Sequence, residues 1–496
     1  MASNAARAAV PTLPTMRSIV NEERLLADVS APAITLKDLR ISTLASTDSA
    51  VKRRLRLSSN FLKLAGFEEN TRFDARALGF EKGIELTYAP NGSHKIHVRT
   101  YGRRKANPLE TQVDLQSQSL IDAAIPSYVE ACRWEIQPGR IQIIPMANRV
   151  FSIGRSMRRR RLEERLEAFV ALTGGCDVRL LEDHGFTVRG VLEFRPQEAR
   201  DTSDRTETGA LNALANGRNI RLLANQDIYK ADWGRVAHHL QAVDGVVPML
   251  HASLQCDDFS CLKDSKSRQA SIENLTSTID MVVPLLRGVD ALMPAVVVIE
   301  NVPGFITSQA GAILQLQLRR MGYQVDAAVL SSPDFGGLTL RRRTYIVASI
   351  WPGFVFPNAT GRNTRPIHEV LAEDIPRMAD VSDRSSVRKG LEGGRARIIR
   401  PGDTNAPTVT KSQPRGAKDS VLMEVDGRYR FIDGPASKRL MGLERVNTEL
   451  LTSDLEAEVI GQSIEAPMHG ALMDAIRRHI LGCTGAPAIA VNAGLF

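Results

Sequence analysis

A cysteine and a glutamate each lie beside a predicted buried strand in the middle of this sequence. The apolar run Val246–Leu250 leads into a polar loop that carries Cys256, and the five apolar residues Ala295–Ile299 lead directly into Glu300 and Asn301. The second run does not alternate with polar residues, which indicates a strand covered on both faces. A thiolate is a strong nucleophile, and a carboxyl group in a desolvated pocket can donate a proton. Together they could perform covalent catalysis.

Two arginines belong to the same stretch. Alternation along residues 341–348 predicts a strand that places Arg341 and Arg343 on one face. Glu300 would lie at the carboxyl end of its strand, where open α/β sheets bind ligands. Taken singly, Cys256 could be a structural loop cysteine, the Glu300-Asn301 pair could cap the following helix, and the arginines could be surface residues. Their combination favours an active site.

These residues resemble the DNA (cytosine-5) methyltransferase family, whose motifs read PCQ, ENV and QxRxR in this order and at similar separations. The resemblance implies an α/β fold with a Rossmann-like, S-adenosylmethionine-dependent core and double-stranded DNA as partner. It implies transfer of a methyl group to carbon 5 of a flipped cytosine through a covalent adduct with Cys256. Glu300 would protonate nitrogen 3, with Asn301 holding it in place. Arg341 and Arg343 would jointly stabilise the base oxygen and clamp the flanking phosphate.

A glycine turn between two predicted strands is the candidate cofactor site. Gly174-Gly175 follows the first strand, and glycines let backbone amides approach a ligand above a helix amino end. The turn resembles the family's FxGxGG motif, with Ala171 or Thr173 where a further glycine is usual. The resemblance assigns Glu193 to the ribose hydroxyls. Taken alone, Glu193 could be a solvated acid at a strand end.

Further cofactor contacts are implied by the same resemblance. It assigns the adenine contact to the Asp227-Ile228 pair. Gly461–Ile464 resembles the family's tenth motif, with Gln462 in place of asparagine, and precedes a predicted helix over Pro467–Leu481. The resemblance spans roughly residues 167–482.

The remaining organisation follows from composition and local pattern. We predict a flexible leader (1–35), a mostly β accessory domain (36–150), a basic helical linker (151–166), the cofactor-binding and catalytic core (167–350), a small target recognition region (351–428), C-terminal motifs that return to the core (429–482) and a tail (483–496). In the accessory domain, Pro90–Gly92 predicts a hairpin between the alternating segments Ile84–Tyr88 and His94–Arg99. Leu57–Phe67 is weakly similar to AbrB-like or SymE-like modules, which makes this domain a candidate DNA-binding module.

Composition agrees with an anionic partner. The 496 residues carry a net charge of +8 and a pI near 9.3. The five cysteines form no CxxC pair, so we expect neither a zinc site nor any other metal. We find no signal peptide and no run of apolar residues long enough to span a membrane, and therefore expect a cytoplasmic protein. The sequence does not fix the oligomeric state.

The residues around Cys256 depart from the family pattern. Gln255 and Asp257 stand where the family has proline and glutamine, and Asp258 adds a second carboxylate. Two nearby carboxylates would raise the thiol pKa and repel DNA phosphate. This leaves two hypotheses open: an active cytosine-5 methyltransferase, or a catalytically weak or inactive DNA-binding relative.

Overall fold

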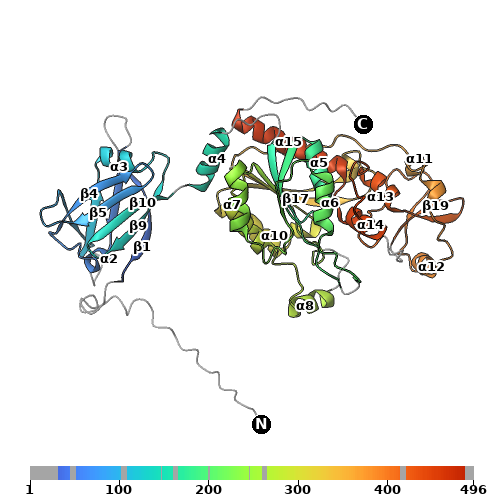
Figure 1. The fold of residues 1–496 in the computed structure, drawn as a ribbon, viewed down its shortest axis with the longest axis horizontal. Helices are drawn as coiled ribbons and strands as arrows, with labels where there is room; N and C mark the ends of the chain where they lie inside the picture. The colour runs from blue at the N-terminus through green and yellow to red at the C-terminus, as the bar shows by residue number, and fades with distance from the viewer. Residues whose placement is uncertain are drawn as a thin grey trace, which may run out of the picture. The chain divides into compact units, whose positions relative to one another are not determined.

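The computed structural model in Figure 1 describes residues 32–44, 52–101, 109–146, 148–159, 166–198, 201–244, 246–259, 265–413 and 420–485. Its contacts divide the chain into two compact units, Met1–Phe151 and Ser152–Phe496. Most of the predicted leader and tail, and Cys261, lie outside the described residues.

The first unit is built on antiparallel strands, as predicted for a mostly β domain. Its six-stranded sheet has the order β1-β9-β10-β5-β4-β6, and its four-stranded sheet has the order β2-β3-β8-β7. Alternating apolar residues of these strands, with Trp134 and Phe73 among the fully buried ones, form its core. The elements are β1 (Thr35–Arg40), β2 (Ser42–Leu44), β3 (Lys52–Ser58), α2 (Phe61–Leu64), β4 (Arg72–Gly79), β5 (Gly83–Tyr88), β6 (His94–Lys95), β7 (His97–Thr100), β8 (Leu109–Leu115), α3 (Gln118–Ala124), β9 (Ala131–Gln137) and β10 (Arg140–Met146).

The predicted hairpin through Pro90–Gly92 is wrong. β5 and β6 do not pair with each other, because β4 lies between them and pairs with both. The chain instead crosses one end of β4, where a Cβ on Gly92 would come within 2.5 Å of the Phe73 backbone. Glycine is needed here for this close backbone approach, and not for a two-strand hairpin turn.

The second unit contains a seven-stranded sheet of order β13-β12-β11-β14-β15-β17-β16. β11, β12, β13, β14 and β15 are parallel, whereas β17 is antiparallel to both of its neighbours. This confirms the predicted Rossmann-like α/β core. The strands are β11 (Leu166–Ala171), β12 (Phe186–Leu192), β13 (Leu222–Ala224), β14 (Met249–Ser253), β15 (Val296–Asn301), β16 (Gln324–Ser331) and β17 (Arg342–Ser349).

Helices lie on both sides of this sheet (Figure 1). α5 packs against α6 and α15, while α9 packs against α7 and α10. The helices are α4 (Arg149–Arg159), α5 (Cys176–Asp183), α6 (Thr208–Asn216), α7 (Trp233–Asp244), α8 (Ser265–Glu273), α9 (Val282–Leu292), η2 (Pro303–Phe305), α10 (Gln309–Arg320), η3 (Ser332–Asp334), α14 (Ser453–Gln462) and α15 (Ala466–Thr484). α4 covers part of the predicted basic linker, and residues 160–165 of that linker lie outside the described residues.

The predicted target recognition region is more regular than its sequence indicates. It holds most of a three-stranded sheet of order β18-β19-β20, with its own apolar cluster around Ile399 and Met423. Its elements and the helix that follows are α11 (Ile367–Val370), η4 (Ile375–Arg377), α12 (Ser385–Glu392), β18 (Arg397–Ile399), β19 (Val421–Val425), β20 (Arg428–Phe431) and α13 (Gly434–Met441).

The sheet brings the predicted site residues to one edge. Gly174, Glu193 and Asp227 follow the ends of β11, β12 and β13, and Cys256 follows β14. Glu300 lies at the end of β15. Because β17 is antiparallel, its beginning reaches the same edge as the ends of the parallel strands. Residues spread over the sequence therefore converge there.

Candidate active site

Cys256 lies in the loop that follows β14 and is partly exposed. Burial raises the pKa of its thiol, and Asp257 raises it further, whereas Arg343 and Arg341 lower it. The thiol is therefore close enough to both arginines to feel their charge. In the absence of a substrate it is mostly protonated at neutral pH.

Asp258 has a structural role that the sequence did not indicate. Its carboxylate is buried and accepts hydrogen bonds from the Thr278 amide (2.7 Å), the Ser277 hydroxyl (3.0 Å) and the Ser271 hydroxyl (3.3 Å). It thus fixes the loop that carries Cys256 to the end of α8 and the segment after it. The predicted repulsion of DNA phosphate by two carboxylates applies only to Asp257, which is exposed.

Glu300 and Arg343 form an ion pair, with 2.8 Å between Arg343 Nε and Glu300 Oε1. Burial raises the pKa of Glu300, and the arginine opposes this rise. In the ladder Glu300 lies opposite Ser253, three residues before Cys256. A buried acid with a raised pKa beside a partly exposed thiol can serve as a proton donor.

Asn301 joins the strand that carries Glu300 to the loop that carries Cys256. Its buried side chain donates to the Leu254 carbonyl (3.1 Å) and accepts from the Val302 amide (2.8 Å). Asn301 thereby joins the end of β15 to the loop before Cys256. Since it bonds backbone rather than the Glu300 side chain, it positions Glu300 through the strand.

Arg341 and Arg343 share one side of the chain, as the alternation predicts, but their surroundings differ. The guanidinium of Arg341 is fully buried and donates to the carbonyls of Val409 (3.0 Å), Gln462 (3.0 Å) and Ser463. It therefore joins the start of β17 to the C-terminal segment after α14. Arg343 is the arginine paired with Glu300.

Three of the four residues 172–175 in the glycine turn after β11 have a left-handed backbone. Leu172, Gly174 and Gly175 have φ values of 60°, 69° and 84°. The sequence placed the missing glycine at Ala171 or Thr173. Leu172 is the non-glycine residue of the turn with a left-handed backbone, and neither Ala171 nor Thr173 has that conformation. A leucine in this conformation costs roughly 1 kcal/mol relative to glycine.

Substitutions at the two glycines are expected to differ in effect. A Cβ at Gly174 would meet only Val459 at 3.7 Å, whereas a Cβ at Gly175 would lie 2.4 Å from the Ala213 amide nitrogen in α6. Gly174→Ala should lower the free energy of unfolding by about 1 kcal/mol, and Gly175→Ala by roughly 3 kcal/mol or more. Urea unfolding of the full chain measures both. Equal losses would show that α6 does not pack on Gly175 as described.

Glu193 is turned toward the glycine turn. Its Oε1 accepts from the Thr173 amide (2.6 Å) and hydroxyl (3.0 Å), and its Oε2 accepts from the Gly174 amide (3.2 Å). Burial raises the pKa of Glu193 to about 7 despite these bonds. Each carboxylate oxygen has two lone pairs, so Oε2 retains capacity for a ligand hydroxyl. The Glu193 carboxylate and the backbone amides of the glycine turn are thus joined by hydrogen bonds.

The remaining predicted cofactor residues differ in exposure. Asp227 is partly exposed and accepts from the Tyr229 amide (3.1 Å), while Ile228 is buried. The side chain of Gln462 is exposed, and its carbonyl accepts from Arg341. The structure therefore brings Asp227 to the same sheet edge as Glu193, and gives the backbone of Gln462 a defined partner.

Two further buried residues support this region and had no sequence signal. Glu465 accepts from the Thr339 amide (3.0 Å) and hydroxyl (2.5 Å), which joins the start of α15 to the segment before β17. Asn212 in α6 donates to the Gly174 carbonyl (2.7 Å). Both contacts join residues more than 30 positions apart, so no local pattern predicts them.

Part of this chain is similar in sequence to known proteins. Residues 224–351 match the family model for C-5 cytosine-specific DNA methylase. The type II methyltransferase M.AgeI of Thalassovita gelatinovora is 21% identical over 252 residues, 49% of this chain and 56% of that protein. DNA (cytosine-5)-methyltransferase 1 of Mus musculus is 34% identical over 117 residues, 23% of this chain and 7% of that protein. This chain thus spans about half the length of the first relative and a small part of the second.

A solved structure aligns over a longer stretch. The crystal structure of the S. pombe Dnmt2 methyltransferase aligns with a TM-score of 0.49 and 16% identity, covering 64% of this chain and 99% of that one. The family match contains Cys256, Glu300 and both arginines, whereas the glycine turn and Glu193 lie before it. No helix in the described part of the chain is long and apolar enough to cross a membrane.

Proposed function

We propose, from the premise that residues 224–351 of this chain belong to the C-5 cytosine-specific DNA methylase family, that the protein transfers a methyl group from S-adenosylmethionine to carbon 5 of cytosine in double-stranded DNA. The observation that carries the proposal is the placement of Cys256, Glu300 and Arg343 at adjoining strand ends, with a buried acid paired to an arginine beside a partly exposed thiol. This is the constellation that a covalent addition to a pyrimidine requires.

The residues have separate tasks in this reaction. The Cys256 thiolate forms a bond to carbon 6, and Glu300 delivers its proton to nitrogen 3, so that carbon 5 becomes an enamine nucleophile. The bound cofactor supplies an electrophilic methyl group. After transfer, a base takes the proton from carbon 5, the bond from carbon 6 to sulfur breaks and returns the thiolate, and nitrogen 3 gives its proton back to Glu300. The base must leave the stack, because carbon 6 is inaccessible in a duplex.

Arg341 and Arg343 have different tasks in this proposal, whereas the sequence assigned both tasks to them jointly. Arg343 lies against Glu300 and close to Cys256, where a cation stabilises the thiolate and charge on the base oxygen. Arg341 bonds backbone carbonyls and is buried, so its task is to hold the start of β17 in place. We therefore assign the base contact to Arg343.

Arg343→Ala should slow methyl transfer by about 10²- to 10³-fold with little change in unfolding free energy. Arg341→Ala should lower the unfolding free energy by roughly 3 kcal/mol, because it leaves buried carbonyls without donors. Single-turnover rates and urea unfolding of both variants test this division. A stable, inactive Arg341→Ala protein would contradict it.

The residues at the glycine turn fit the cofactor. Gly174 leaves space at the turn, since a Cβ there would meet only Val459, and Glu193 offers a carboxylate oxygen at the adjacent strand end. Gly174, Gly175 and Glu193 would hold the amino-acid and ribose parts of the cofactor. Asp227 and Ile228, after the next strand, would hold the adenine. Gln462 would close the pocket from the C-terminal segment.

Affinity for S-adenosylmethionine should depend on pH through Glu193. Ribose hydroxyls donate to the charged carboxylate, and its pKa of about 7 means that it is half protonated at neutral pH without ligand. Affinity should therefore rise about tenfold from pH 6 to pH 8. Calorimetry should show weaker binding by Glu193→Ala and no pH dependence in Glu193→Gln. An unchanged pH dependence in Glu193→Gln would exclude the ribose contact.

The direct test incubates the full chain with S-adenosylmethionine labelled in its methyl group and duplex DNA of mixed sequence. Label in DNA that co-migrates with 5-methylcytosine after digestion would support the proposed activity. The alternative, a DNA-binding relative without turnover, predicts DNA binding without label. The exposed carboxylate of Asp257 is the feature that favours slow turnover, since it raises the pKa of the thiol.

A further inference from the structure

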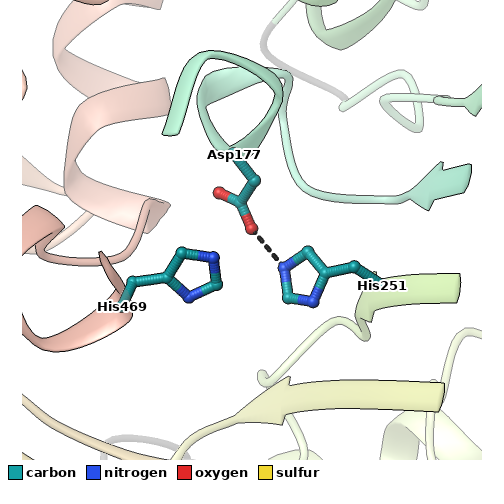
Figure 2. A group of neighbouring side chains, drawn as sticks. All are labelled: Asp177, His251 and His469. Carbon is teal, nitrogen blue, oxygen red and sulfur yellow. Dashed lines mark hydrogen bonds and ion pairs between the residues drawn. The ribbon is translucent and has the colours of Figure 1, made fainter. Parts of the chain in front are cut away.

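Three ionisable side chains converge inside the second unit, in a cluster that the proposed reaction does not use. They are Asp177 in the first turn of α5, His251 in β14 and His469 in α15. His251 Nε2 lies 2.7 Å from Asp177 Oδ2, and one ligand atom from each residue lies within 4.8 Å of the others. Figure 2 shows the imidazole of His469 turned toward the other two. All three side chains are buried, none with more than 1% exposed surface.

The polar atoms of this cluster are not satisfied among the described residues. His469 Nδ1 lies 3.2 Å from the Tyr345 hydroxyl, but its Nε2 has no hydrogen-bond partner there, and neither has His251 Nδ1. An unpaired nitrogen in a dry interior costs free energy, so such an atom calls for an ion or an ordered water. The carboxylate of Asp177 likewise has His251 as its only side-chain hydrogen-bond partner within the described ranges.

The donor set is that of a transition metal. Two imidazole nitrogens and one carboxylate oxygen are ligands that Zn²⁺ takes at about 2.0–2.2 Å, with a water in the fourth position. Tyr345 lies where a partner commonly orients a metal-bound histidine through its other ring nitrogen. In a tetrahedral site with these bond lengths two ligand atoms lie about 3.4 Å apart. The Asp177–His251 pair at 2.7 Å would therefore have to open slightly, and any pair near the 4.8 Å limit would have to close by about 1 Å.

We propose that Asp177, His251 and His469 bind one divalent transition-metal ion, Zn²⁺. The ion would join α5, which starts at the glycine turn, to β14, which leads to Cys256, and both to α15. The proposal assigns the metal no step in methyl transfer. Its test measures metal binding and does not depend on the proposed activity. It replaces the prediction, made from the missing CxxC pairs, that the chain holds no metal.

The test is metal binding by the full chain, expressed without a histidine tag and freed of metal with a chelator. Competition with a chromophoric zinc indicator should give one Zn²⁺ per chain. Co²⁺ in its place should give the intense visible absorption of a site with four or five ligands, whereas Co²⁺ on scattered surface groups would give only a weak octahedral spectrum. Both readouts are independent of turnover.

Variants separate the cluster from other histidines. His251→Gln and His469→Gln should each lose the stoichiometric Zn²⁺. Tyr345→Phe should keep it with affinity lowered about 10- to 100-fold. His184→Gln is the matched control, because His184 at the end of α5 pairs with Asp474 of α15 (2.9 Å) outside the cluster and should bind Zn²⁺ like the wild type. Circular dichroism confirms that each variant is folded.

Two results would overturn the proposal. Wild-type protein that takes up no Zn²⁺ beyond the double variant His251→Gln/His469→Gln would leave the cluster as a buried polar network completed by water. Stoichiometric Zn²⁺ that persists in the double variant would place the ion elsewhere. If the histidine variants do not fold, the Co²⁺ spectrum of the wild type and the weakened affinity of Tyr345→Phe still decide the question.

Discussion

Cys256→Ala is expected to abolish methyl transfer while leaving the affinity for DNA nearly unchanged. The thiol forms the bond to carbon 6, whereas contacts to phosphate supply most of the affinity for DNA. Labelled methyl transfer and a DNA-binding titration measure the two effects separately. Cys483→Ala is the matched control, because Cys483 is also partly exposed but lies at the end of α15, outside the proposed pocket. Methylation by Cys256→Ala at a substantial rate would remove this cysteine from its role.

DNA that contains 5-fluorocytosine should trap the covalent step. After methyl transfer this base has no removable proton at carbon 5, so the thiol cannot be released. Wild-type and Cys483→Ala proteins should then remain attached to the DNA through denaturing electrophoresis, and only when S-adenosylmethionine is present. DNA of mixed sequence supplies the recognised site. An adduct that forms with Cys256→Ala, or forms equally well without the cofactor, would contradict the proposed chemistry.

Glu300→Gln is expected to slow methyl transfer by about 10²- to 10⁴-fold, because an amide cannot give a proton to nitrogen 3. The substitution preserves size and a hydrogen bond, so the fold and the affinity for DNA should change little. Single-turnover rates and the rate of trapping on 5-fluorocytosine measure the loss. Asp257→Asn is the control: it also removes a carboxylate near Cys256, but it should raise the rate at neutral pH, since Asp257 raises the pKa of the thiol.

The pH profile distinguishes a proton donor from a residue that only shapes the pocket. The wild-type rate requires a charged Cys256 and a protonated Glu300, and burial raises the pKa of both. The wild-type rate should therefore decline at high pH, because Glu300 has lost its proton there and cannot donate one. In Glu300→Gln the rate should rise with pH to a plateau as the thiolate forms. A profile of the same shape in both proteins would leave Glu300 with a structural role.

Local sequence was sufficient for the core strands and for the residues at their ends. Uninterrupted apolar runs predicted β14 and β15, and chain continuity then fixed where Cys256 and Glu300 must lie. The alternation that placed Arg341 and Arg343 on one face was also local. Apolar runs and the two-residue period of side chains can be seen within a few residues of the sequence, which explains why these strands were predicted correctly.

Only the tertiary structure decided what surrounds each side chain. Period-two alternation predicts the same face for Arg341 and Arg343. In the fold, Arg341 donates to the carbonyls of residues 409 and 462, whereas Arg343 pairs with Glu300. The hairpin at Gly92 failed because a strand from earlier in the chain lies between the two segments.

The cluster of Asp177, His251 and His469 has no sequence signature at all, because its members are 74 and 218 positions apart along the chain. A local motif is visible in a sequence when its residues lie within a few positions of one another. Contacts between a helix, a strand and a second helix depend on packing, and packing is a property of the folded chain.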